Sequence, residues 1–151
     1  MSNRDVYTLS SSNRGQSFES ERLHPWSIAA CPMTSMSMFA AQSRVLGAWE
    51  TAGQVFYADI RSGRSNAGAL TAAPGEGAGR KHPRLAVNHK GETLLVWTEG
   101  MAWARGGSVA WQLFDRGAGK PTGSAGSQAG VPVWSFAAAA PHPNGTFTIF
   151  Y

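Results

Sequence analysis

Two histidines that each precede a proline, His24 and His82, lie 58 residues apart in a chain of 151 residues. Neutral imidazoles are ligands for Zn²⁺, and a bound zinc ion lowers the pKa of a coordinated water molecule. A glutamate follows each of two apolar stretches, as Glu50 and Glu99. A carboxylate beside such a metal acts as a base or orients a ligand. These residue types would suit metal-assisted hydrolysis if the fold brings them together.

The remaining candidates are cationic and aromatic residues close in sequence to these groups. Cationic side chains suit an anionic substrate, such as an ester or phosphoester, and aromatic side chains suit a sugar ring. Tyr151 is a third catalytic candidate, because it ends a third apolar stretch where Glu50 and Glu99 end the first two. The residues expected to contact the substrate are Lys81, Arg84, Trp103 and Arg105.

Each candidate also has a purely structural interpretation. A histidine beside a proline at the start of a strand is often hydrogen-bonded within the fold, and glutamates are most often solvated. Trp49 and Trp97 fit a core between sheets better than a ligand platform. Arg84 is equally able to form an ion pair with Glu99. The types and spacing of these residues therefore leave the choice between catalysis and structure open.

The elements that would position these residues are short strands. Eighteen glycines and eight prolines interrupt the chain, and only 15% of its residues are charged. Short apolar runs between turn residues predict an all-β fold. Two copies of a four-strand pattern are expected, at 24–30, 45–50, 55–60 and 68–73, and at 82–87, 93–99, 108–114 and 120–128. Two strands precede these copies and two follow them, at 6–10 and 19–23, and at 133–138 and 147–151.

The segment between the first two predicted strands contains a spaced set of turn residues: Ser11, Asn13, Gly15, Ser17 and Phe18. The set resembles the Asp-box (BNR) turn of the sialidase superfamily, S-x-D-x-G-x-[ST]-[WF], with Asn13 in place of the usual aspartate. A short side-chain acceptor bonds the turn backbone, glycine takes the open dihedral, and we expect the aromatic ring to pack beneath. The resemblance implies a sialidase-like β-propeller, in which this turn is structural.

The predicted strands add up to three blades of four, with a half-blade at each end of a single domain, 1–151. Three blades are too few to close a ring, and the resemblance implies six. Two copies related by a two-fold axis would complete both mixed blades, so we expect a homodimer. His24 and His82 would then appear twice around one axis. The alternative is that the chain is a fragment of a longer propeller.

Three functions follow from these observations. The first is the metal-assisted hydrolase, with its active site at the mouth of the propeller channel and zinc as its cofactor. The second is a sialidase-like glycoside hydrolase, although the Arg-Ile-Pro signature of that family is absent. The third is a non-catalytic propeller that binds glycans or proteins.

Charge and hydropathy limit the expected partners and location. The formal net charge of +4 comes from scattered basic residues, which does not indicate nucleic-acid binding. No apolar run is long enough to span a bilayer, the first residues do not form a signal peptide, and the single cysteine excludes an intrachain disulfide. We therefore expect a cytoplasmic protein without a membrane or nucleic-acid partner.

Overall fold

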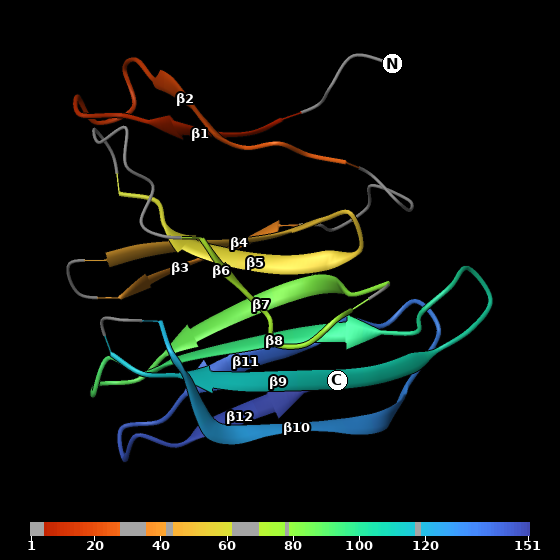
Figure 1. Cartoon of the computed structure of the whole chain (residues 1–151). Coiled ribbons are helices and arrows are strands. Elements are labelled where there is room, and N and C mark those ends of the chain that lie inside the picture. The colour runs from red at the N-terminus through yellow and green to blue at the C-terminus, as the bar shows by residue number, and fades with distance from the viewer. Residues whose placement is uncertain (1–4, 28–35, 42–43, 62–69, 78, 117–118) are drawn as a thin grey trace.

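A computed structural model describes residues 5–27, 36–41, 44–61, 70–77, 79–116 and 119–151 (Figure 1). Over these ranges the chain is all-β, with twelve strands and no helix. None of the described segments is therefore a helix of the length and apolar character needed to cross a membrane. The strands form four antiparallel sheets that contain two, four, four and two strands in chain order.

Each sheet is a simple meander of strands that follow one another in the chain. The first sheet joins β1 (Val6–Ser10) to β2 (Glu19–His24). The second contains β3 (Met36–Ala41), β4 (Arg44–Thr51), β5 (Gln54–Asp59) and β6 (Thr71–Ala72). The third contains β7 (Lys81–Val87), β8 (Thr93–Glu99), β9 (Gly107–Phe114) and β10 (Pro121–Val131). The fourth joins β11 (Ala138–Pro141) to β12 (Phe147–Phe150).

The two four-stranded sheets pack face to face, with β3, β4 and β5 against β7. Successive side chains of a strand point to opposite faces of its sheet, so each central strand contributes to two cores. Leu95 and Trp97 of β8 pack in a core that includes Leu46 of β4. Leu94 and Val96 of the same strand pack on the opposite face, beside β11 and β12. Burial on both faces explains why 94–97 of β8 is an uninterrupted apolar run.

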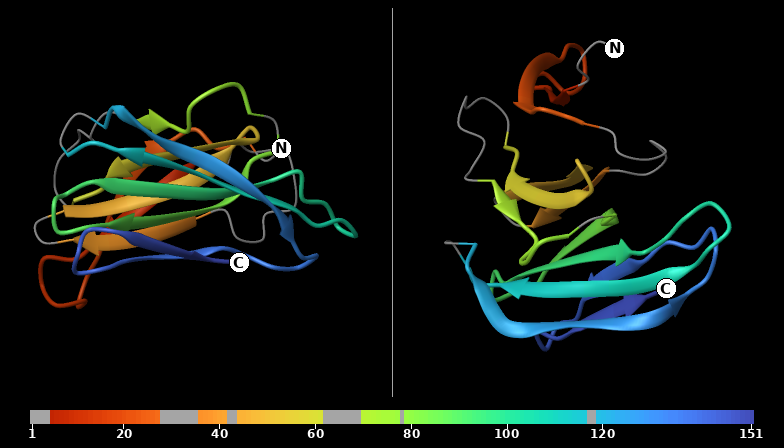
Figure 2. Two further views of the ribbon diagram at one scale, coloured as in Figure 1. Left: turned by 90° about the horizontal axis from the view of Figure 1, so that it is seen from below. Right: turned by 45° about the vertical axis from the view of Figure 1, so that its right-hand side comes forward.

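The terminal hairpins cover the outer faces of this central pair only in part (Figure 2). The first hairpin packs through Val6 of β1 on Trp49 and Ala58. Met36 and Met38 of β3 stay 49% and 73% exposed. The last hairpin packs through β11 on β7 and β8. Each end of the stack therefore presents a sheet that is incompletely covered.

The structure confirms the all-β prediction, and its sheets contain the predicted numbers of strands. The strand predicted at 24–30 is wrong: His24 ends β2, 25–27 lie outside any strand, and 28–30 fall outside the described residues. The strand that pairs with β4 is β3. The prediction rested on the match of His24-Pro25 to His82-Pro83, which is only a similarity of two short sequences. Which segment becomes a strand depends on which one pairs with the edge of β4, and that segment is β3.

Three smaller differences concern strand boundaries. The strand predicted at 133–138 is mostly a turn, in which the Ser135 amide donates to the Pro132 carbonyl at 3.2 Å, and β11 begins only at Ala138. The fourth strand of the second sheet is β6, two residues long, while 68–69 lie outside the described residues. The fourth strand of the third sheet, β10, extends three residues beyond its predicted end.

Candidate functional site

The Asp-box-like turn between β1 and β2 is held by hydrogen bonds of its own side chains. The Ser11 hydroxyl donates to Asn13 Oδ1 at 3.0 Å and accepts from the Gly15 amide at 2.8 Å. Asn13 Oδ1 also accepts from the Ser17 amide at 2.9 Å. Gly15 has φ +84°, a left-handed value that favours glycine. Phe18 is 58% exposed, so its ring does not pack beneath the turn as expected.

His24 lies at the end of β2, against the outer face of the second sheet. Its Nδ1 accepts a hydrogen bond from Trp49 Nε1 at 2.9 Å, and its ring packs edge-on against Phe56. Burial, with a smaller contribution from the charge of Arg22, lowers the pKa of His24. An indole nitrogen only donates, so the proton of the neutral ring is on Nε2. This tautomer presents no lone pair to a metal.

His82 lies near the start of β7 and has the opposite tautomer. Its Nδ1 is 2.9 Å from Thr98 Oγ1, and the Thr98 hydroxyl donates to the Lys81 carbonyl at 3.2 Å. Because a hydroxyl has one proton, Nδ1 must donate to it, and Nε2 carries the lone pair. Burial, followed by the charges of Lys81 and Arg84, lowers the pKa of His82 to about 4. The ring is therefore neutral at pH 7 and has an acceptor at Nε2.

A cavity of about 90 Å³ lies beside His82. Phe136 meets the imidazole edge-on, with ring centroids 4.9 Å apart. Trp103 and Trp134 stand almost perpendicular to each other, at 84°, with centroids 4.3 Å apart. These two indoles are 72% and 55% exposed. We call this site the Trp cavity; its lining comes from the start of β7, from the loop after β8 and from the turn before β11: Lys81, His82, Met101, Ala102, Trp103, Trp134, Ser135 and Phe136.

Glu99 is tied to a buried arginine and does not face the Trp cavity. Its Oε1 accepts from Arg80 Nε at 2.9 Å and from Trp97 Nε1 at 2.7 Å. The Arg80 guanidinium lies over the Trp97 ring, 5.1 Å from its centroid, and donates to Gln54 Oε1 at 3.1 Å and to the Ala73 carbonyl. This cluster joins the second sheet to the third. The ion pair of Glu99 is thus with Arg80.

The other two catalytic candidates also lie away from the Trp cavity. Glu50 is 4% exposed within β4, where its backbone carbonyl accepts from Trp26 Nε1 at 2.8 Å. Tyr151 follows β12, is 41% exposed, and lines a different cavity beside that strand. The lining of the Trp cavity contains no carboxylate among the described residues.

The cationic candidates mostly bond backbone carbonyls. Lys81 Nζ donates to the Met101 carbonyl at 3.3 Å, which leaves two of its protons for a ligand at the cavity. Arg105 Nε donates to the Gly100 carbonyl at 3.0 Å, in the loop that carries Trp103. Arg84 donates to the Pro83 carbonyl at 2.9 Å.

Of the residues predicted to bind a metal or substrate or to catalyse, the structure brings three together at one cavity: Lys81, His82 and Trp103. The lining of this cavity also contains Trp134 and Phe136, which we predicted to lie in a strand at 133–138. Pro132, directly before them, was a signal for a turn that the prediction did not use. Across the described ranges, no three His, Cys, Asp or Glu side chains form a group that could hold a metal ion. Comparison of the chain with family models, with curated proteins and with solved structures gives no significant match. Its function must therefore be argued from this geometry.

Proposed function

We propose that the chain binds a sugar-like ligand in the Trp cavity. The observation that carries this proposal is the perpendicular pair of exposed indoles, Trp103 and Trp134, at the rim of a cavity. Exposed aromatic clusters mark binding surfaces, and an indole combines a broad apolar face with a polar N–H. A sugar ring offers the matching combination of C–H faces and hydroxyl groups.

The polar groups of the cavity favour a sugar that carries a negative charge. His82 Nε2 is an acceptor for a ligand hydroxyl, because the ring is neutral and its proton is on Nδ1. Lys81 supplies a cation at the cavity wall, and Arg105 supplies a second in the loop of Trp103. Cations of this kind attract a carboxylate or phosphate on the ligand.

In the architecture that we propose, the sheets are blades of a sialidase-like propeller and the Trp cavity lies at one mouth of its channel. Three features support it. Each sheet is a meander, β3 contacts β7 and β7 contacts β11, as neighbouring inner strands would. The Asp-box-like turn connects β1 to β2, which we assign as the third and fourth strands of a blade. The start of β7 and the end of β8 share the end of the stack that carries the cavity.

A hydrolase is the second candidate, because His82 Nε2 is also able to take a proton from water or to bind Zn²⁺ with groups from another chain. A sialidase mechanism has less support, since Glu50, Glu99 and Tyr151 do not line the cavity. Binding without turnover needs no residue beyond those that the cavity already contains.

The test is a glycan array with acidic and neutral sugars, followed by calorimetric titration with the best ligand. We expect acidic sugars to bind and Trp103→Ala or Trp134→Ala to weaken binding at least about tenfold, the usual loss for an aromatic anchor. The matched control is Phe18→Ala, an aromatic of similar exposure in the Asp-box-like turn. Unchanged affinity in both tryptophan variants would overturn the proposal. Cleavage of an aryl ester or phosphoester that is abolished by a chelator and by His82→Ala would favour the hydrolase.

A further inference from the structure

Both terminal hairpins have a strand edge that no other described strand covers. β1 pairs with β2, and β12 pairs with β11, on one side only. The opposite edges of β1 and β12 have no partner among the strands that the structure describes. An open edge presents unpaired N–H and C=O groups, which favour the addition of a further strand.

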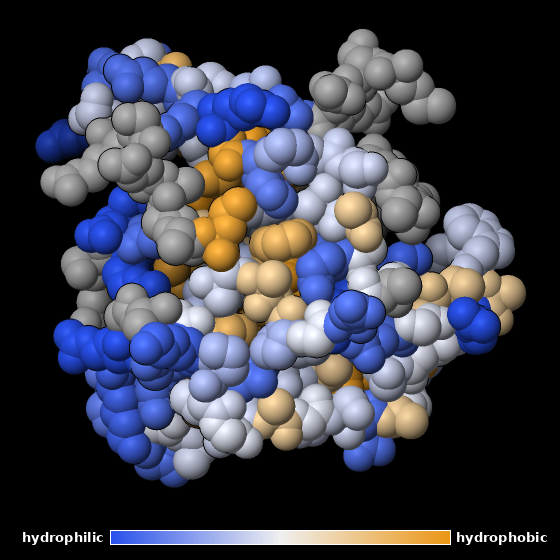
Figure 3. Space-filling view, in the orientation of Figure 1, coloured by the Kyte–Doolittle hydropathy of each residue, from blue (hydrophilic) through white to orange (hydrophobic). Residues whose placement is uncertain are grey.

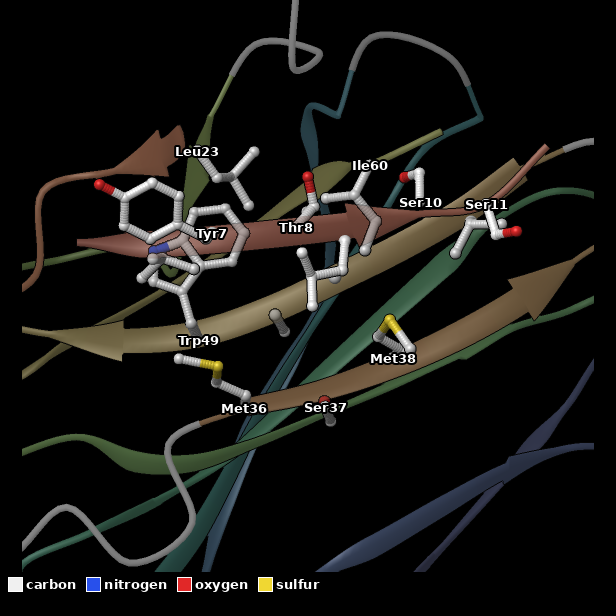
Figure 4. Close-up of a pocket in the computed structure, with 15 residues that line it drawn as sticks. Tyr7, Thr8, Ser10, Ser11, Leu23, Met36, Ser37, Met38, Trp49 and Ile60 are labelled. Atoms are coloured by element: carbon white, nitrogen blue, oxygen red, sulfur yellow. The ribbon is translucent and has the colours of Figure 1, made fainter. Parts of the chain in front are cut away.

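A groove of about 540 Å³ follows the open edge of β1 (Figure 4). It contacts six consecutive residues, 6–11. Since successive side chains point to opposite faces, a groove that reaches all six must run along the edge of the strand. Its floor is β3 and β4, where Met36 and Met38 are exposed and Trp49 is buried beneath Val6. Figure 3 shows, on the face that it displays, apolar side chains gathered between the first hairpin and the second sheet.

A second groove, of about 590 Å³, lies beside β12 at the other end of the stack. One wall is β12 with the residue after it, through Phe147, Ile149 and Tyr151. The floor is the face of β9 that β11 and β12 leave uncovered, with Trp111 and Leu113. The two grooves are therefore similar in size, and each combines an open strand edge with a bare apolar sheet face.

Each groove has room for a two-stranded hairpin, and the other end of the chain forms such a hairpin. The groove over β3 and β4 lacks two strands beside β1, and β11–β12 is a two-stranded hairpin whose outer face is Ala138, Ala140, Thr148 and Phe150. Apart from Phe150, which is 76% exposed, the residues of this face are small, and all but Thr148 are apolar. The groove over β9 lacks two strands beside β12. The first hairpin fits there, because Tyr7 and Leu9 on its outer face are 55% and 67% exposed.

We propose that a second copy of this chain fills both grooves. The β11–β12 hairpin of each protomer lies over β3 and β4 of its partner, and β12 pairs with the open edge of β1. The resulting sheet has the order β11-β12-β1-β2, which reproduces the four-stranded meanders of the second and third sheets. A two-fold axis relates the two protomers, so the last hairpin of each one covers β3 and β4 of its partner. The same arrangement places the first hairpin of each over β9 of its partner, and both kinds of groove are filled. This inference does not depend on the proposed sugar binding.

The test measures the mass of the 151-residue chain in solution by light scattering over a range of concentrations. We expect twice the chain mass for the unchanged protein. Phe150→Asp and Met38→Asp should each give the mass of one chain, because a carboxylate without a partner would be buried in the interface. Both residues are largely exposed in the single chain, so we expect the far-ultraviolet circular dichroism to stay unchanged. The control is Phe18→Asp, an exposed aromatic that lines neither groove.

Three results would overturn the proposal: a wild-type chain that stays monomeric, open-ended assemblies, or a dimer that survives both substitutions. A monomer would mean that the grooves stay open or take strands from elsewhere. If the variants fail to fold, the melting temperature of the wild type decides the question. It rises with protein concentration for a dimer and is independent of concentration for a monomer.

Discussion

The central sheets and the terminal hairpins are built from similar strands that are buried in different ways. β8 is buried over almost its whole length, because sheets pack on both of its faces. In β12 burial alternates, with Phe147 and Ile149 partly covered and Thr148 and Phe150 exposed. The difference arises from the number of neighbouring sheets. We therefore expect stability to be concentrated in the central pair, while the hairpins keep apolar surface exposed.

The largest expected effect compares two phenylalanines of these regions. Phe114 of β9 is fully buried and packs edge-on against Tyr57, with centroids 5.1 Å apart. Phe114→Ala should lower the free energy of unfolding by about 3–5 kcal/mol, because it leaves a cavity between the two central sheets. Phe150→Ala, at an exposed position of β12, should lower it by less than about 1 kcal/mol in dilute protein. Urea unfolding measures both, and equal losses would contradict the comparison.

A smaller effect compares two ion pairs. The Arg80 side chain is 9% exposed in its pair with Glu99 between the central sheets, whereas Arg22 is 57% exposed in its pair with Asp5 beside the first hairpin. Arg80→Ala should lower the free energy of unfolding by about 2 kcal/mol, since Gln54 and Glu99 each lose the buried guanidinium that donates to them. Arg22→Ala should change it far less, because solvent screens an exposed ion pair. Urea unfolding of the two variants in low and high salt tests this, and an Arg22 loss as large as that of Arg80 would count against it.

The smallest effect concerns pH and the two histidines. The pKa of His82 is about 4 in the fold, below the ordinary 6.5, so the unfolded chain binds more protons between these values. Stability should therefore fall as the pH drops from 6.5 toward 4, by about 1–2 kcal/mol for a ring that solvent still reaches. The pKa of His24 is also lowered, so this residue acts in the same direction.

The measurement is urea unfolding at several pH values between 4 and 7. His82→Gln should flatten the dependence on pH, because glutamine keeps a polar side chain without a group that titrates there. A slope as steep in this variant as in the unchanged chain would show that other groups cause it. His24→Gln tests the same effect in the terminal hairpin.

β8 and β9 of the third sheet were predictable, because β8 contains the apolar run 94–97, apolar and aromatic residues recur along β9, and turn residues lie between them. β3 was missed, since the resemblance of His24-Pro25 to His82-Pro83 placed a strand twelve residues too early. The candidate site was half predictable. Lys81, His82 and Trp103 stand close to a strand start or end, where side chains of one sheet edge meet.

The amino-acid sequence by itself determined the all-β class, the alternation of short strands with turns and the Asp-box-like turn. These depend on local patterns of apolar residues, glycine and proline. Tertiary structure alone decided that Trp134 and Phe136 join Trp103 at one cavity, and that Glu99 bonds Arg80 and not a ligand. It also decided the tautomers of the two histidines, through Trp49 and Thr98. The physical reason is that each of these contacts joins segments distant in the chain, and their pairing depends on how sheets pack.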